Sequence, residues 1–185
     1  MEFDAFDEGI ELGGLRNRDE IRLLVCYLLK AIDGPISKEN MNDAMLENGL
    51  ANYFEINQAV SELLANGSID MNVDENGTEM LFVTDRGREI AGELETTLPK
   101  TVREKAVNSA IRLTTLAKNT RENKIETEKL PGGGYNITFS LMNGEEVLMK
   151  LTVFVSDSMQ LEAVKKNFLS DPVRLYSGIL TALTI

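Results

Sequence analysis

The pattern that most resembles a metal site is a run of alternating oxygen-bearing side chains, Asp70-x-Asn72-x-Asp74-x-Asn76. Calcium loops of the EF-hand type alternate their ligands in this way, but they need glycine at the sixth position and glutamate at the twelfth. Glu75 and Leu81 occupy these positions here. The residues between the polar ones are apolar, as in a strand with one face buried. We therefore predict a strand and no metal.

Few other residues indicate catalysis. The sequence has no histidine and one cysteine, Cys26, so His-based nucleophile pairs and zinc sites are missing. The glycine run 132–134 lacks the lysine and Ser/Thr of a phosphate loop and precedes a predicted strand. Carboxylates or lysines could still catalyse a reaction, but no spacing indicates it. We predict that the protein is not an enzyme and needs no cofactor.

Charge is distributed unevenly along the 185 residues. The net charge is −11, with 7 Lys/Arg against 21 Asp/Glu in residues 1–98, and 12 against 9 in residues 99–185. This split indicates two units with different surfaces. Nucleic-acid binders usually carry a basic patch, because affinity comes largely from phosphate contacts. An acidic N-terminal half therefore argues against DNA.

No apolar run approaches the roughly 20 residues that span a bilayer. The first residues are acidic and lack the basic start of a secretory signal. The single cysteine excludes an internal disulfide. We expect a cytoplasmic protein that does not enter the membrane.

The N-terminal half reads as three helices followed by a hairpin and another helix. Apolar residues at three- and four-residue spacing predict helices over 18–33, 38–47 and 53–65, and a fourth from Thr84 to about 98. Asn17, Ser37, Asn52 and Thr84 are suitable N-caps.

The hairpin lies within 68–88, where two apolar-rich runs flank Asn76-Gly77. A two-residue loop there would pair Val73 with Met80 and Met71 with Phe82, placing these side chains on one face.

With this order of elements, residues 17 to about 95 resemble the winged helix-turn-helix of PadR- and MarR-like bacterial regulators. The resemblance rests on the third helix, on the hairpin that follows it, and on the segment Thr84-Asp85-Arg86-Gly87-Arg88 that opens the next helix. The whole chain, with its acidic arm and C-terminal extension, resembles an uncharacterised Firmicutes family of winged-helix proteins catalogued as a domain of unknown function. This resemblance implies that the third helix enters a major groove and that the hairpin touches the backbone or minor groove.

The resemblance implies five DNA-contact candidates: Asn57, Gln58 and Ser61 as base readers, and Arg86 and Arg88 as phosphate contacts. The helical wheel places Glu55 and Glu62 on the same outward face, and the wing is acidic, so this surface would repel phosphates. Phe54 on that face suits a thymine methyl group or a protein partner.

The C-terminal half reads as a basic helix over 100–122, three strands over 125–130, 135–141 and 146–155, and two final helices capped by Ser156 or Asp157 and by Asp171. A three-residue loop, 142–144, would set Phe139 against Val147 and make one face apolar. The last helix is apolar enough to be buried, against its own chain or a second copy.

These observations predict an α+β protein: a flexible acidic arm (1–16), a winged helix-turn-helix domain (17–98), and a basic linker helix with an α+β dimerisation or sensing domain (99–185). The function that follows is a DNA-binding transcriptional regulator acting as a homodimer. The alternative is a protein-protein interaction module that uses the acidic winged helix without DNA.

Overall fold

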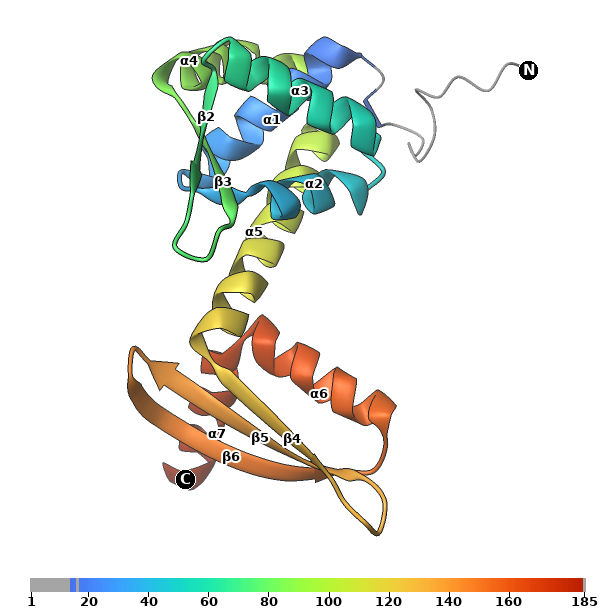
Figure 1. Ribbon diagram of the computed structural model, residues 1–185, viewed down its shortest axis with the longest axis vertical. Helices are drawn as coiled ribbons and strands as arrows, with labels where there is room; N and C mark the ends of the chain where they lie inside the picture. The colour runs from blue at the N-terminus through green and yellow to red at the C-terminus, as the bar shows by residue number, and fades with distance from the viewer. Residues whose placement is uncertain (1–13, 16, 185) are drawn as a thin grey trace, which may run out of the picture. The chain divides into compact units, whose positions relative to one another are not determined.

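The structure, a computed structural model, describes residues 14, 15 and 17–184 (Figure 1). The chain divides into two compact units, residues 1–114 and 115–185. The border falls within the long helix α5 (Lys100–Glu122), further along the chain than the expected division after residue 98. The described residues form seven α-helices and two three-stranded antiparallel sheets, so the predicted α+β class is confirmed.

Local capping explains where the helices of the N-terminal unit begin. The Asn17 side chain accepts the N–H of Asp19 at 2.9 Å, and Asn52 accepts that of Glu55 at 2.9 Å. Ser37 and Thr84 act in the same way, as predicted. The elements in chain order are α1 (Arg18–Ile32), β1 (Ile36–Ser37), α2 (Lys38–Leu46), α3 (Tyr53–Ala65), β2 (Ile69–Val73), β3 (Glu79–Val83), α4 (Asp85–Leu94) and a 3-10 turn (Glu95–Thr97).

Helix α1 lies at the centre of the core of this unit. Seven of its residues are buried, and it packs against α3, α4 and β3. Leu15, which we placed in a flexible arm, is buried and donates its N–H to the Leu50 carbonyl at 2.7 Å. The rest of that arm, 1–13 and 16, lies outside the described residues. The sheet order is β1-β3-β2, and the short strand β1 was not predicted.

The predicted register of the β2–β3 hairpin is wrong by one residue. Met71 pairs with Leu81 and Val73 with Glu79, so Leu81 and Val83 of β3 are the buried residues. The loop has three residues between Asp74 and Thr78, because the Asp74 carboxylate accepts the N–H groups of Asn76 and Thr78, both at 2.9 Å. Gly77 adopts a left-handed φ of 83°, as this loop class requires.

The C-terminal unit contains a sheet in the order β4-β5-β6, with two helices packed on one face (Figure 1). Asp157 and Asp171 cap these helices, as predicted, by accepting the N–H groups of Gln160 and Arg174. The elements are β4 (Lys124–Lys129), β5 (Tyr135–Asn143), β6 (Glu146–Val155), α6 (Ser158–Ser170) and α7 (Pro172–Thr184).

The second hairpin also differs from the prediction. Asn143 pairs with Glu146, which leaves a two-residue turn, and Phe139 lies opposite Leu151 rather than Val147. A register shift between Leu141 and Met142 accommodates the change, and the Met142 N–H is bound by the Asn123 side chain at 3.1 Å. The predicted apolar face is nevertheless correct. Leu151 and Val147 are an even number of residues apart on β6, so both side chains point to the same face of the sheet.

The described part of its own chain does not bury helix α7, and its burial against a second copy stays a prediction. Within α7, all of whose residues are described, Pro172 is the only buried one. The exposed fractions are 61% for Val173, 43% for Leu180 and 77% for Leu183. The sequence pattern identified the apolar residues correctly, but the described residues of the chain supply too few partners to cover them.

Candidate nucleic-acid interface

The candidate site is the outer face of α3, and the core below fixes which residues it presents. Ile56, Ala59, Val60 and Leu63 are buried at three- and four-residue spacing. The exposed stripe on the other side consists of Phe54, Gln58, Ser61 and Ala65. None of these four residues is charged.

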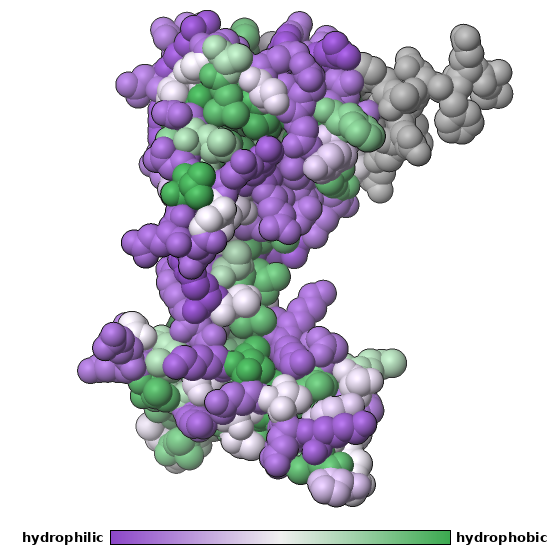
Figure 2. Space-filling view, in the orientation of Figure 1, coloured by the Kyte–Doolittle hydropathy of each residue, from purple (hydrophilic) through white to green (hydrophobic). Residues whose placement is uncertain are grey.

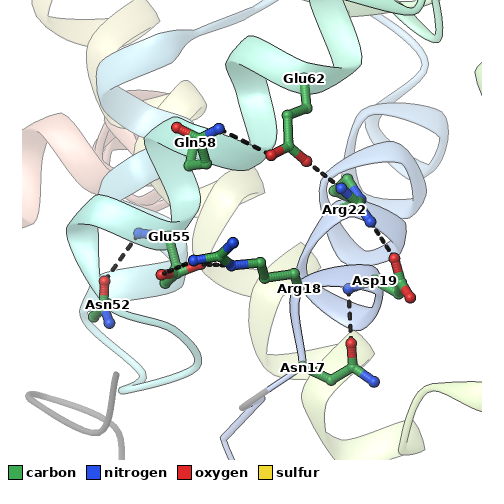
Figure 3. A network of polar contacts seen from close by, with 8 residues as sticks. All are labelled: Asn17, Arg18, Asp19, Arg22, Asn52, Glu55, Gln58 and Glu62. Carbon is green, nitrogen blue, oxygen red and sulfur yellow. Dashed lines mark hydrogen bonds and ion pairs between the residues drawn. The ribbon is translucent and has the colours of Figure 1, made fainter. Parts of the chain in front are cut away.

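The predicted outward placement is wrong for Glu55 and holds only in part for Glu62, whose side chain is 32% exposed. Arg18 Nε donates to the Glu55 carboxylate at 3.1 Å, and Arg22 forms ion pairs with both Glu62 and Asp19 (Figure 3). The Glu55 side chain is only 12% exposed. The two glutamates therefore lie at the contact between α1 and α3, where arginines on α1 partly offset their charge.

The pKa of Glu62 shows the same environment. A hydrogen bond from the Gln58 amide and another from Arg22 hold the pKa of this carboxyl below its ordinary value. The paired Arg22 guanidinium has its pKa raised by Asp19 and Glu62 in turn. Arg22 is thus shared by two carboxylates, so its single positive charge offsets only one of the two negative charges.

The three predicted base readers do share one helix, but they differ in accessibility. Gln58 and Ser61 are exposed, while Asn57 is half-buried. Each makes a local hydrogen bond: Asn57 to the Tyr53 carbonyl, Gln58 to Glu62 and Ser61 to the Asn57 carbonyl, all at 2.9 Å. These bonds are within one helix, so a ligand could replace them without unfolding it.

An aromatic pair stands at the start of α3. Phe54 is 79% exposed, and its ring meets that of Tyr53 edge-on with centroids 5.9 Å apart. Tyr53 is 53% exposed. Beside Tyr53 and Asn57 lies a polar hollow of about 380 Å³, bordered by α2 and by Thr78 and Glu79 of the hairpin.

The two predicted phosphate contacts behave differently. Arg88 is half-buried and forms an ion pair with Asp33 at 2.8 Å. Arg86 is exposed and has no partner among the described residues. The β2–β3 hairpin is acidic, with Asp70 and Glu75 exposed.

Most cations of the N-terminal unit are already paired with carboxylates of that unit. Hydrophilic residues cover most of the visible face of this unit (Figure 2). Arg103 lies over the Tyr27 ring, and Arg86 and Lys105 are the cations left unpaired within the described part of the unit. The pairs are Arg18–Glu55, Arg22–Glu62, Lys30–Glu95, Lys38–Glu79, Arg88–Asp33, Lys100–Glu104 and Arg112–Glu47.

Sequence reasoning missed the part that α1 plays in this site. Arg18 and Arg22 are one helical turn apart, which places them on one face of α1, but nothing in the sequence says which helix that face meets.

Cys26, also on α1, is buried, and burial raises the pKa of its thiol to about 11. It is a core residue rather than a nucleophile.

No three Asp, Glu, Cys or His side chains in the described part of the chain gather closely enough to hold a metal ion. None of the helices in this same part is both long and apolar enough to cross a membrane.

The chain was compared with known proteins in three ways. No match is found among curated proteins, and none among solved structures. A family model described as "Domain of unknown function (DUF4364)" matches residues 21–183, which covers both units. The chain therefore belongs to the DUF4364 family.

Proposed function

We propose that this protein is a winged-helix DNA-binding transcriptional regulator that acts as a homodimer. In this proposal α3 enters the major groove and the β2–β3 hairpin is the wing. The observation that carries the proposal is the uncharged outer face of α3. Arg18 holds the largely buried Glu55 against α1, and Arg22 pairs with the half-exposed Glu62, so the charge of these carboxylates beside that face is partly offset.

The element order of the N-terminal unit supports the same proposal. Three helices, a hairpin and a further helix follow one another as in the PadR- and MarR-like regulators that the sequence resembles. Fold likeness alone says little about function, so the residues of α3 must supply the rest.

Gln58 is the best placed base reader. Its amide carries both a donor and an acceptor, which is what the adenine edge requires in the major groove. Ser61 lies one turn further on the same exposed stripe. A bound base would take the Gln58 amide from Glu62, which keeps its ion pair with Arg22.

Arg86 is the best placed phosphate contact, because it is exposed and unpaired within the described residues. Arg88 would have to leave Asp33, whose side chain is 75% exposed. Exposed pairs of this kind contribute little stability, so the exchange costs little.

The test is selection of duplexes from a random library by the full chain at low salt. Gln58→Ala should weaken the selected complex roughly 10-fold and relax base preference at one position. Asn108→Ala, an exposed amide on α5, is the matched control and should have no effect. Failure to select any sequence would contradict the proposal.

A second candidate function is a protein-interaction module, and the exposed Tyr53–Phe54 pair favours it. Aromatic residues are enriched where proteins bind one another. In a pull-down from cell extract, Phe54→Ala should lose a partner that the wild type retains, while Met159→Ala, which is 83% exposed in the wild type, should keep it. Retention of every partner by Phe54→Ala would contradict this candidate.

A further inference from the structure

A polar hollow lies between α2, the start of α3 and the loop end of the β2–β3 hairpin. Helix α2 packs against both α3 and β3, which fixes the walls of the hollow (Figure 1). Its volume of about 380 Å³ is typical of sites that hold a whole small molecule. The charges and the unpaired polar groups around it indicate what kind of molecule that is.

Negative charge is in excess around this hollow. Three carboxylates line it, those of Glu39, Asp43 and Glu79, together with one cation, Lys38. Lys38 Nζ pairs with the Glu79 carboxylate at 3.3 Å, so these two charges offset one another. Glu39 and Asp43 have no ion-pair partner among the described residues. They are four residues apart on α2 and therefore share a face, where like charges repel.

Asn42, between these two carboxylates on α2, is a buried amide with an unpaired oxygen. It is 7% exposed and borders the hollow, and its Oδ1 accepts no hydrogen bond from any described residue. A buried acceptor without a partner lowers the stability of a fold, so native proteins rarely keep one without a use. A hydrogen-bond donor bound in the hollow would supply the missing partner.

Helix α3 contributes a second acceptor and an aromatic ring. Asn57 Nδ2 donates to the Tyr53 carbonyl at 2.9 Å, so the amide oxygen of Asn57 is the part of this group that a ligand can use. Tyr53 also borders the hollow, and about half of its surface is exposed. The face of an aromatic ring attracts cations.

We propose that this hollow binds a small organic cation that bears a protonated amine or guanidine group. Its charge balances Glu39 and Asp43, and its N–H groups donate to the side-chain oxygens of Asn42 and Asn57. Ammonium and guanidinium groups carry several donors and no acceptor, which matches a hollow rich in acceptors. The ring of Tyr53 provides a surface on which such a group can lie. A neutral ligand would leave both carboxylates unpaired, and an anion would be repelled.

The test is an NMR titration of the isotope-labelled full chain with agmatine, which carries a guanidinium and an ammonium group. Salt at about 0.15 M screens general attraction to the acidic surface. Saturable shifts should appear at the residues that border the hollow, with a dissociation constant of about 1 mM or tighter. Butylurea, a neutral compound with the planar shape of a guanidinium, should cause none at the same concentration. Equal shifts from the two compounds would overturn the proposal.

Two matched variants test the charge requirement. Asp43→Asn keeps the shape of the side chain but removes its charge, so agmatine should bind at least about 5-fold more weakly. Asp70→Asn makes the same change at an exposed carboxylate of β2 that does not line the hollow, and it should alter binding by less than about 2-fold. Equal weakening in the two variants would show attraction to the acidic surface as a whole and would overturn the proposal.

Asn42→Leu distinguishes a ligand-binding role from a structural one. Leucine is similar in size and needs no hydrogen-bond partner, so the midpoint of thermal unfolding should stay the same or rise. Agmatine binding should nevertheless weaken roughly 10-fold, because a hydrogen bond to a charged donor is lost. Wild-type affinity in this variant would contradict the proposal. If Asn42→Leu does not fold, the comparison of Asp43→Asn with Asp70→Asn still decides the result.

A final comparison identifies the source of the cation. The peptide N-acetyl-Gly-Arg-Gly amide carries the same guanidinium on a peptide backbone. Agmatine should bind more tightly than this peptide, because the hollow holds a small molecule whole. Tighter binding of the peptide would overturn a small-molecule ligand in favour of a side chain from another protein. The inference goes beyond the proposed function and needs no DNA, so duplex selection and agmatine titration can fail independently.

Discussion

Helices α3 and α7 each contain 13 residues, but their environments are opposite. Helix α3 has four buried apolar residues, and its two glutamates are paired with arginines of α1. Helix α7 has one buried residue, and its exposed surface is aliphatic. Helix α3 thus buries one apolar face within its own unit, whereas most of the surface of α7 stays exposed.

This difference separates two kinds of exposed residue. The outer residues of α3 are not needed to hold the fold, so changes there should alter recognition more than stability. The outer residues of α7 are apolar, so changes there should alter association.

Truncation of a buried residue of α3 should have the largest effect. Ile56 is fully buried, so Ile56→Ala should lower the free energy of unfolding by between about 2 and 5 kcal/mol. Phe54→Ala on the same helix should change it by less than about 0.5 kcal/mol. Urea unfolding measures both. Similar losses in the two variants would show that Phe54 is covered and that α3 has no free face.

Two glycines of α4 should respond in opposite directions. A Cβ on Gly87 would lie 2.1 Å from the Ser68 carbonyl oxygen, so Gly87→Ala should cost about 3 kcal/mol. A Cβ on Gly92 would meet only Lys30 Nζ, at 3.5 Å, so Gly92→Ala should stabilise the unit by up to about 1 kcal/mol. Thermal unfolding of the pair measures how tightly α4 fits the start of β2. Equal stability of the two variants would contradict this contact.

The buried thiol of Cys26 should make stability depend on alkaline pH. Burial raises the thiol pKa from 9.0 to about 11, so above pH 9 the unfolded chain loses this proton before the folded chain does. The free energy of unfolding should therefore fall by about 2 kcal/mol between pH 8 and 11 relative to Cys26→Ala. Parallel pH profiles for the two proteins would show that the thiol is accessible to solvent.

The smallest expected effect concerns the α1–α3 pairing. The folded pKa of Glu62 is lowered, so its contribution to stability is present above the ordinary glutamate pKa and is lost as pH falls through the lowered value. Arg22→Gln should raise this pKa toward the ordinary value, and Lys165→Gln, which affects a separate pair, should not. Carboxyl NMR titration measures the shift. An unchanged Glu62 pKa in Arg22→Gln would contradict the pairing.

Local sequence features predicted the helix starts well. Asn17, Asn52 and Thr84 cap the helices that follow them, because a cap depends only on the next few residues. The hairpin registers were not predictable in this way. In one hairpin the Asp74 side chain selects the loop, and in the other Asn123, distant in sequence, binds Met142.

The candidate site was predicted only in part. The exposure of Gln58 and Ser61 follows from helical periodicity. The burial of Glu55 and the pairing of Glu62 do not, because they depend on where α1 places Arg18 and Arg22. The exposure of α7 was also beyond sequence reasoning, since an apolar stripe does not indicate whether its own chain or another covers it.

The central claim is that α3 approaches DNA with an uncharged face while most cations of its unit remain in ion pairs. The most direct test is the salt dependence of the selected complex, because each phosphate neutralised adds about −0.9 to the slope of log K against log salt. With Arg86 and Lys105 unpaired in the described part of each N-terminal unit, and with Arg88 released from Asp33, a dimer should give a slope no steeper than about −5. A slope of about −8 or steeper would contradict the claim, because many more cations would then contact phosphates.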